Sequence, residues 1–147
     1  MDLSGTHIWL VLWKAYDSIE AHAMRSIESL DMCISDFGIL EYLLNKGAAN
    51  INVIGQKLSL ASGSITAAVD RLEQRGLVQR VASATDRRAK LVELTSQGRA
   101  LIKKAFKKHS IDMEDAVGGL SRTEREELLK LLKKLGKSAV ALLQAEE

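Results

Sequence analysis

Residues 58–76 read LSLASGSITAAVDRLEQRG, and their spacing predicts a helix with two unlike faces that ends before Gly76. Ile65, Val69 and Leu72 recur at i, i+4 and i+7, so one face is apolar and is expected to face a core. The other side carries short polar or methyl side chains where a solubilising helix would carry Glu and Lys: Ser62, Ser64, Thr66 and Ala67. Short side chains allow close approach to another surface, and hydroxyl groups can bond phosphates and base edges. We interpret the segment as a DNA-recognition helix with these four residues toward the major groove and Arg71 on a phosphate.

The segment that follows predicts a hairpin with a basic tip. Residues 77–81 and 90–94 read as short strands, joined by a loop from 82 to 89 that contains Thr85-Asp86-Arg87-Arg88. An arginine at such a tip is favoured in the minor groove, where the negative potential is strong. A recognition-type helix followed by this hairpin predicts a winged helix-turn-helix that binds duplex DNA. The plainer alternative is an exposed hairpin with a local Asp–Arg pair.

Helices are predicted on both sides of this module. A first helix is expected over residues 6–29, a second from an N-cap at Ser35 to Gly47, and a third after Asn50. Thr95 is expected to cap a long helix to about residue 115, and Ser121-Arg122-Thr123-Glu124 to open the last helix as a capping box. The fold class is therefore mainly α with a small β-hairpin, in one domain over 1–147. The winged helix-turn-helix is expected to span 35–100. The flanking helical regions, 1–32 and 101–147, carry more apolar surface than this module can cover, so we expect them to hold a homodimer together.

Composition and charge limit the functional classes. The composition, 46% hydrophobic and 27% charged residues, is typical of a globular protein. The sequence shows no apolar run of membrane length, no secretory leader and a single cysteine. We therefore expect a cytoplasmic protein without a membrane partner. Residues 71–108 hold eleven Lys and Arg against three Asp and Glu, whereas residues 1–45 hold two against seven. Basic charge is thus concentrated on the expected DNA-reading part. The histidines, His7, His22 and His109, are too scattered for a metal site, and no catalytic or cofactor motif stands out, so we expect neither an enzyme nor a cofactor.

Four runs of residues resemble the MarR family of bacterial transcriptional regulators. They are Phe37-Gly38-Ile39-Leu40, the stretch 72–78, Asp86-Arg87-Arg88, and Leu94-Thr95-Ser96-Gln97-Gly98. The resemblance implies that Arg88 enters the minor groove and Asp86 orients it, and Arg87 and Lys90 are candidates for the neighbouring phosphates. It also implies a homodimer on a pseudo-palindromic operator. Many members carry larger polar or basic residues at the positions of Ser62 and Ala67, which leaves fewer bidentate base contacts here.

The sequence also suggests that a small ligand regulates DNA binding. Residues 61–66, ASGSIT, with Val69-Asp70 resemble the branch of the family that responds to quinones and related aromatic electrophiles. Aromatic character and the family's usual site indicate a pocket lined by Trp9, Trp13, Tyr16 and Phe37, so we expect a repressor released by a small aromatic, phenolic or quinone-type compound. One alternative is a repressor switched by oxidation or alkylation of Cys33. Another, from a different class, is a winged-helix protein-interaction module that does not bind DNA.

Overall fold

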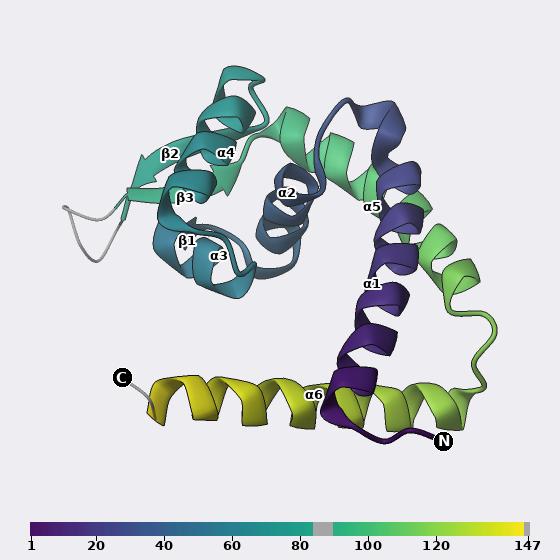
Figure 1. The fold of residues 1–147 in the computed structure, drawn as a ribbon. Helices are drawn as coiled ribbons and strands as arrows, with labels where there is room; N and C mark the ends of the chain where they lie inside the picture. Colours follow the sequence, from purple (N-terminus) through teal and green to yellow (C-terminus); the bar gives the residue numbers. More distant parts are fainter. Residues whose placement is uncertain (84–89, 146–147) are drawn as a thin grey trace. The chain divides into compact units, whose positions relative to one another are not determined.

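The computed structural model describes residues 1–83 and 90–145, and these divide into two compact units, 1–113 and 114–147. The first unit opens with α1 (Gly5–Ile27), η1 (Glu28–Leu30) and α2 (Ile34–Lys46). It continues through β1 (Ala49–Asn50), α3 (Ile51–Lys57), α4 (Ser62–Gln74), β2 (Val78–Ala82) and β3 (Lys90–Leu94), and α5 (Ser96–Ala116) runs into the second unit (Figure 1). The predicted mainly helical winged helix-turn-helix is confirmed. No helix in the described part of the chain is both long and apolar enough to cross a membrane.

Local signals in the sequence explain most helix ends. Ser4 caps α1 by accepting from the His7 amide, and Asn50 caps α3 by accepting from the Asn52 amide at 2.9 Å. Gly76 ends the α4 segment with φ +69°, a left-handed conformation that glycine adopts without strain. The expected N-cap at Ser35 is wrong: the N-cap position is Cys33, two residues earlier, and its side chain makes no capping bond.

The three strands form an antiparallel sheet in the order β1-β3-β2. The predicted hairpin is confirmed as β2 and β3, with Val78 opposite Leu94 and Ala82 opposite Lys90. Strand β1 was not expected from the sequence, because two residues show no alternation. It pairs Ala49 with Val92 and so joins the α2–α3 connection to the hairpin.

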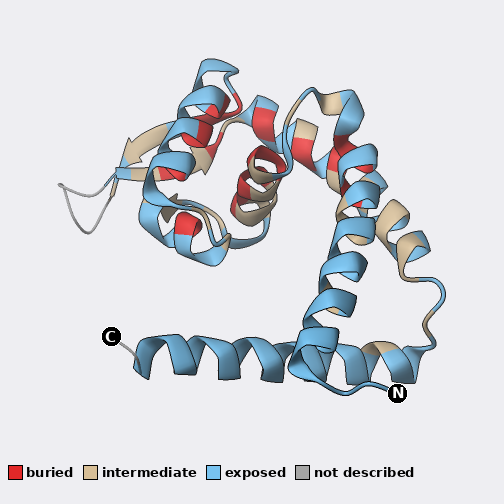
Figure 2. Cartoon of the chain, viewed as in Figure 1, coloured by how far each residue is buried: buried red, intermediate tan, exposed pale blue. Residues whose placement is uncertain are grey.

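The hydrophobic core lies in the first unit, where α2, α4, the hairpin and the first part of α5 meet (Figure 2). Its fully buried members include Phe37, Leu40, Leu72, Leu77 and Ile102. By contrast, only the last turns of α1 contribute buried residues. The rest of α1 exposes large apolar side chains to solvent.

The second unit consists of the end of α5 and α6 (Arg122–Ala145). The predicted capping box is confirmed: the Ser121 amide donates to Glu124 Oε2 at 2.8 Å, and the Glu124 amide donates to Ser121 Oγ at 3.4 Å. The Ser121 hydroxyl also donates to Glu124 Oε2 at 2.6 Å, and this bond, followed by the one from the Ser121 amide, lowers the pKa of the Glu124 carboxyl. The described residues of α6 are amphipathic, yet none of them is buried.

Candidate nucleic-acid interface

Helix α4 presents a small-residue face to solvent, as the sequence predicted. Its apolar stripe, formed by Ile65, Ala68, Val69 and Leu72, is buried in the core. The exposed side of its first two turns carries Ser62, Ser64, Thr66 and Ala67. The Thr66 hydroxyl donates to the Ser62 carbonyl at 3.0 Å, so its lone pairs remain able to accept from a ligand.

The turn before α4 holds this helix close to α3. Ser59 adopts φ +53°, and the Leu60 amide donates to the Gly55 carbonyl at 2.8 Å. A side chain at Gly55 would place its Cβ 3.2 Å from Ile65 Cγ2, which shows how closely the two helices approach. The pair therefore forms the helix-turn-helix, with α4 as its second, outward-facing helix.

Strand β2 is bonded to one flank of α4 through a single arginine. Arg80 donates to Asp70 at 2.6 Å and to the carboxylate of Glu73, while its own amide donates to Glu73 at 3.2 Å. The bond to Asp70 is the main cause of a raised pKa for the Arg80 guanidinium. Lys90, at the start of β3, is exposed. The expected groove residues of the tip, Asp86, Arg87 and Arg88, lie outside the described residues.

The opposite flank of α4 is bonded to the junction between α1 and α2. Arg71, expected on a phosphate, donates from Nη2 to Asp36 Oδ1 at 2.6 Å and from Nε to Oδ2 at 3.3 Å. This bond to Asp36 is the main cause of a raised pKa for Arg71. Arg75 donates to the carbonyls of Asp31 and Leu30 at 2.9 and 3.0 Å. These partners could not be predicted from the sequence, although Arg71 and Arg75, four residues apart, are spaced to share one side of a helix.

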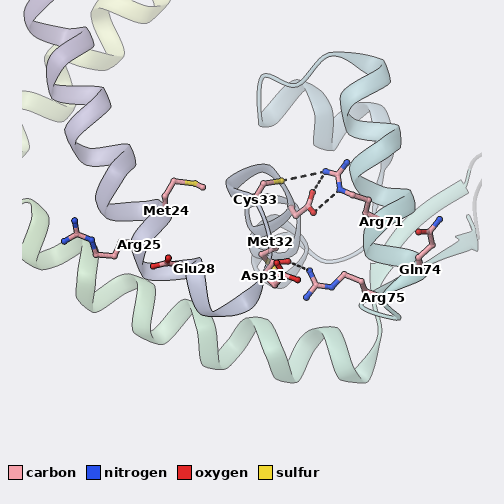
Figure 3. Close-up of a pocket in the computed structure, with 10 residues that line it drawn as sticks. Met24, Arg25, Glu28, Asp31, Met32, Cys33, Arg71, Gln74 and Arg75 are labelled. Atoms are coloured by element: carbon pink, nitrogen blue, oxygen red, sulfur yellow. Dashed lines mark hydrogen bonds and ion pairs between the residues drawn. The ribbon is translucent and has the colours of Figure 1, made fainter.

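A cavity of about 980 Å³ lies beside these bonds, between the end of α1 and α4 (Figure 3). Its lining consists of Met24, Arg25, Glu28, Asp31, Met32, Cys33, Asp36, Arg71, Gln74 and Arg75. Cys33 is exposed, with Sγ 3.0 Å from Ser35 Oγ and 3.8 Å from Arg71 Nη2. The cavity therefore combines two methionines and one thiol with three arginines and three carboxylates.

In the described part of the chain, the four residues of the expected aromatic pocket do not line a common cavity. Phe37 is buried in the core with its ring centroid 4.8 Å from that of His109, because the apolar face of α2 turns inward. Trp9 and Trp13 stack on the exposed part of α1 with centroids 6.4 Å apart, and Tyr16 donates to Glu20 at 2.6 Å. None of the four lines the cavity described above or a smaller one of about 550 Å³ between the end of α1 and α5.

Metal binding has no support among residues 1–83 and 90–145. No three His, Cys, Asp or Glu side chains gather there in a group that could hold an ion. His109 instead makes a 2.5 Å hydrogen bond between its Nδ1 and the buried Ser26 hydroxyl, which connects α5 to α1.

Comparison with known proteins places this geometry among DNA-binding regulators. Residues 34–90 match the sequence profile of the MarR family. The HTH-type transcriptional regulator MhqR of Bacillus subtilis (strain 168) is 38% identical over 132 residues, which cover 90% of this chain and 91% of that protein.

Two solved structures are also similar. A mutant of MarR from E. coli complexed with operator DNA is 25% identical, with a TM-score of 0.79 over 92% of this chain and 99% of that one. Bordetella bronchiseptica BpsR, whose DNA binding is regulated by 6-hydroxynicotinic acid, is 25% identical with a TM-score of 0.79, over 91% and 94% of the two chains. The relatives are regulators of transcription.

Proposed function

Because the chain belongs to the MarR family of transcriptional regulators, we propose that it is a cytoplasmic, homodimeric repressor that binds a pseudo-palindromic operator and is released by a small aromatic compound. The observation that carries the DNA-binding part is the exposed small-residue face of α4, held between bonds on both flanks. A DNA-bound relative of the same fold supports this reading. It disfavours the alternative of an interaction module without DNA binding.

The proposed DNA contacts follow from the placement of α4 and the hairpin. Ser62, Ser64, Thr66 and Ala67 form the major-groove face, where short side chains permit close approach of the helix. The hairpin tip supplies the minor-groove arginine, Arg88, oriented by Asp86, with Arg87 and Lys90 on phosphates. Because phosphate contacts dominate affinity, binding is expected to fall steeply with salt.

Dimerisation is supported by the large apolar surface that the terminal helices expose. On α1 it comprises Ile8, Trp9, Leu10, Val11, Trp13 and Tyr16; on α6 it comprises Leu128, Leu129, Leu131, Leu132, Leu135, Val140, Leu142 and Leu143. Exposed surface of this kind marks an interface with another molecule. A second copy also supplies the two recognition helices that a pseudo-palindrome needs, about 34 Å apart.

The cavity between α1 and α4 is our candidate for the effector site. Its volume is within the range of sites for small organic molecules, its methionines can pack against an aromatic ring, and its charged side chains offer partners to polar ring substituents. The regulation of BpsR by an aromatic acid supports this class of compound. The exposed aromatic residues of α1 remain candidates for an effector site completed by a second protomer.

A second candidate switch is the thiol of Cys33. It is exposed, and it lines the same cavity beside the Arg71 guanidinium. A modified sulfur would therefore stand next to a residue of the recognition helix. In this version an oxidant or electrophile would replace the reversible ligand.

Selection of genomic fragments by the purified protein, followed by titration of the selected duplex at several salt concentrations, tests the proposal. We expect tight binding by a dimer, with an affinity that falls linearly in log–log coordinates as salt rises. Sedimentation in the same buffer measures the oligomeric state. A monomer in solution, or a protein that enriches no fragment, would contradict the proposal.

A further inference from the structure

We propose that Arg71 and Arg75 are positioning residues, which attach the recognition helix to the α1–α2 junction and set its rotation about its own axis. The idea rests on the proposed DNA-binding function and gives Arg71 a role other than the phosphate contact expected from the sequence. We call the two arginines with Asp36, Leu30 and Asp31 the junction clamp.

The Arg71–Asp36 pair fixes both distance and angle. Two guanidinium nitrogens donate to the two carboxylate oxygens, and a bidentate pair of this kind restricts orientation as well as separation. The Asp36 side chain is only 5% exposed, whereas that of Arg71 is 50% exposed. A buried carboxylate without its cation is strongly unfavourable, so Asp36 keeps Arg71 in this position.

Arg75 adds two more directional bonds one turn later. Its two terminal nitrogens donate to successive carbonyls, those of Leu30 and Asp31, where the chain leaves η1. Asp31 adopts a left-handed conformation, φ +49° and ψ +50°, and so ends η1 at the point where Arg75 binds. The clamp therefore attaches the last two turns of α4 to a defined point of the backbone.

The buried stripe sets which side of α4 faces inward, and directional bonds define its orientation more finely. Burial of Ile65, Val69 and Leu72 is itself non-directional. Directional bonds are made on the flanks, by the clamp on one side and by Arg80 with Asp70 on the other. With side chains about 5 Å from the helix axis, a rotation of about 20° displaces their tips by about 2 Å. Such a displacement breaks hydrogen bonds to base edges, which need about 2.7–3.2 Å.

The clamp also borders the cavity. Asp31, Asp36, Arg71 and Arg75 all line it, and Cys33 Sγ lies 3.8 Å from Arg71 (Figure 3). A molecule in the cavity, or a modified thiol, would thus meet the clamp without touching the DNA-facing side of α4. The clamp is the physical connection between the proposed effector site and the recognition helix.

The test compares Arg71→Gln, Arg71→Lys, Asp36→Asn and the Arg71→Gln/Asp36→Asn double variant with the unmodified dimer on its selected operator. Lys90→Gln, at a proposed phosphate contact, is the comparison variant. A clamp predicts that Arg71→Gln and Asp36→Asn each weaken operator binding at least about tenfold, while the dependence of log affinity on log salt concentration keeps its slope. The double variant should bind the operator no more weakly than either single variant, because the two substitutions remove the same interaction. Arg71→Lys should also lose affinity, since lysine keeps the charge but lacks the planar fork.

A second measurement separates positioning from support of the fold. Operators with single base-pair changes inside one half-site are titrated alongside the selected one. Loosening the clamp should bring the affinities for the changed and the selected operators closer together, because a misoriented α4 reads base edges less well, whereas a lower content of folded protein would leave their ratio unchanged.

Three results would overturn the inference. In the first, Arg71→Gln reduces the slope of log affinity against log salt concentration by about one per half-site, as Lys90→Gln does, while Asp36→Asn binds like the unmodified protein. Arg71 is then a phosphate contact. In the second, the affinity and the discrimination between the selected and changed operators are the same in all variants as in the unmodified protein. In the third, affinity falls only in proportion to the folded fraction measured by circular dichroism. Binding by the unmodified dimer reports on the proposed function, so the two ideas can fail separately.

Discussion

Gly98→Ala is predicted to destabilise the protein because the first turn of α5 lies directly against the backbone of Leu77. A Cβ added at Gly98 would meet the Leu77 carbonyl oxygen at 1.9 Å and its carbon at 2.8 Å. Neither partner is free to move alone. Leu77 is 1% exposed, its amide donates to Leu72, and its carbonyl accepts from the Thr95 amide at 3.1 Å.

The size of the effect follows from the displacement required. Real Cβ atoms essentially never come within 3.0 Å of such an atom, so the backbones must separate by at least 3.0 − 1.9 = 1.1 Å. Overpacking of a core costs about 1–3 kcal/mol, and losing the bond from Thr95 adds about 1 kcal/mol. We therefore expect a loss of about 3 kcal/mol, which lowers Tm by about 10 °C in a chain of this size.

Thermal and urea denaturation followed by circular dichroism measure this loss. Gly5→Ala is the matched control, because Gly5 also lies in the first turn of a helix and a Cβ there meets nothing within 4 Å. The control should change the free energy of unfolding by less than about 0.5 kcal/mol. A Gly98→Ala protein as stable as this control would refute the close approach of α5 to Leu77.

Three further predictions concern the hairpin tip, the thiol and the last helix. Arg88→Ala is expected to weaken operator binding by about 1–3 kcal/mol per half-site without lowering Tm; equal affinities at one salt concentration would argue against the groove contact. Cys33→Ser is expected to keep its release from DNA by a non-electrophilic phenol, and loss of that response would make the thiol the sensor. Glu124 has a pKa lowered by Ser121, so its contribution to α6 is present above its unfolded pKa and is lost as pH falls through the folded value. Ser121→Ala should therefore raise the pKa of Glu124 in an NMR titration, and an unchanged titration curve would contradict the capping-box origin of the shift.

Features that depend on near neighbours in the chain could be predicted from the sequence. The Ser121–Glu124 capping box needs only its own residues, and the Thr95 hydroxyl accepts from the Gly98 amide at 3.0 Å at the start of α5. The apolar stripe of α4 follows from spacing alone. The helical architecture was predictable because each of these signals is local.

Features that depend on distant partners could not be predicted. Asp36 and Arg71 are 35 residues apart, and nothing in either segment identifies the other as its partner. The spacing of Phe37 with Leu40 and Leu43 predicts that its side chain points inward, as it does, but the contact of its ring with His109 on α5 could not be predicted. Strand β1 exists only because β3 passes beside it.

The absence of any buried residue among those described in α6 has a consequence for how this protein behaves at different concentrations. If a second copy covers that helix, as proposed, unfolding and dissociation become one process, and the melting temperature rises with the amount of protein present. The fraction of folded protein would then depend on its concentration. Copies made in isolation would be the least stable ones, and the molecules that persist long enough to meet an operator would already be paired.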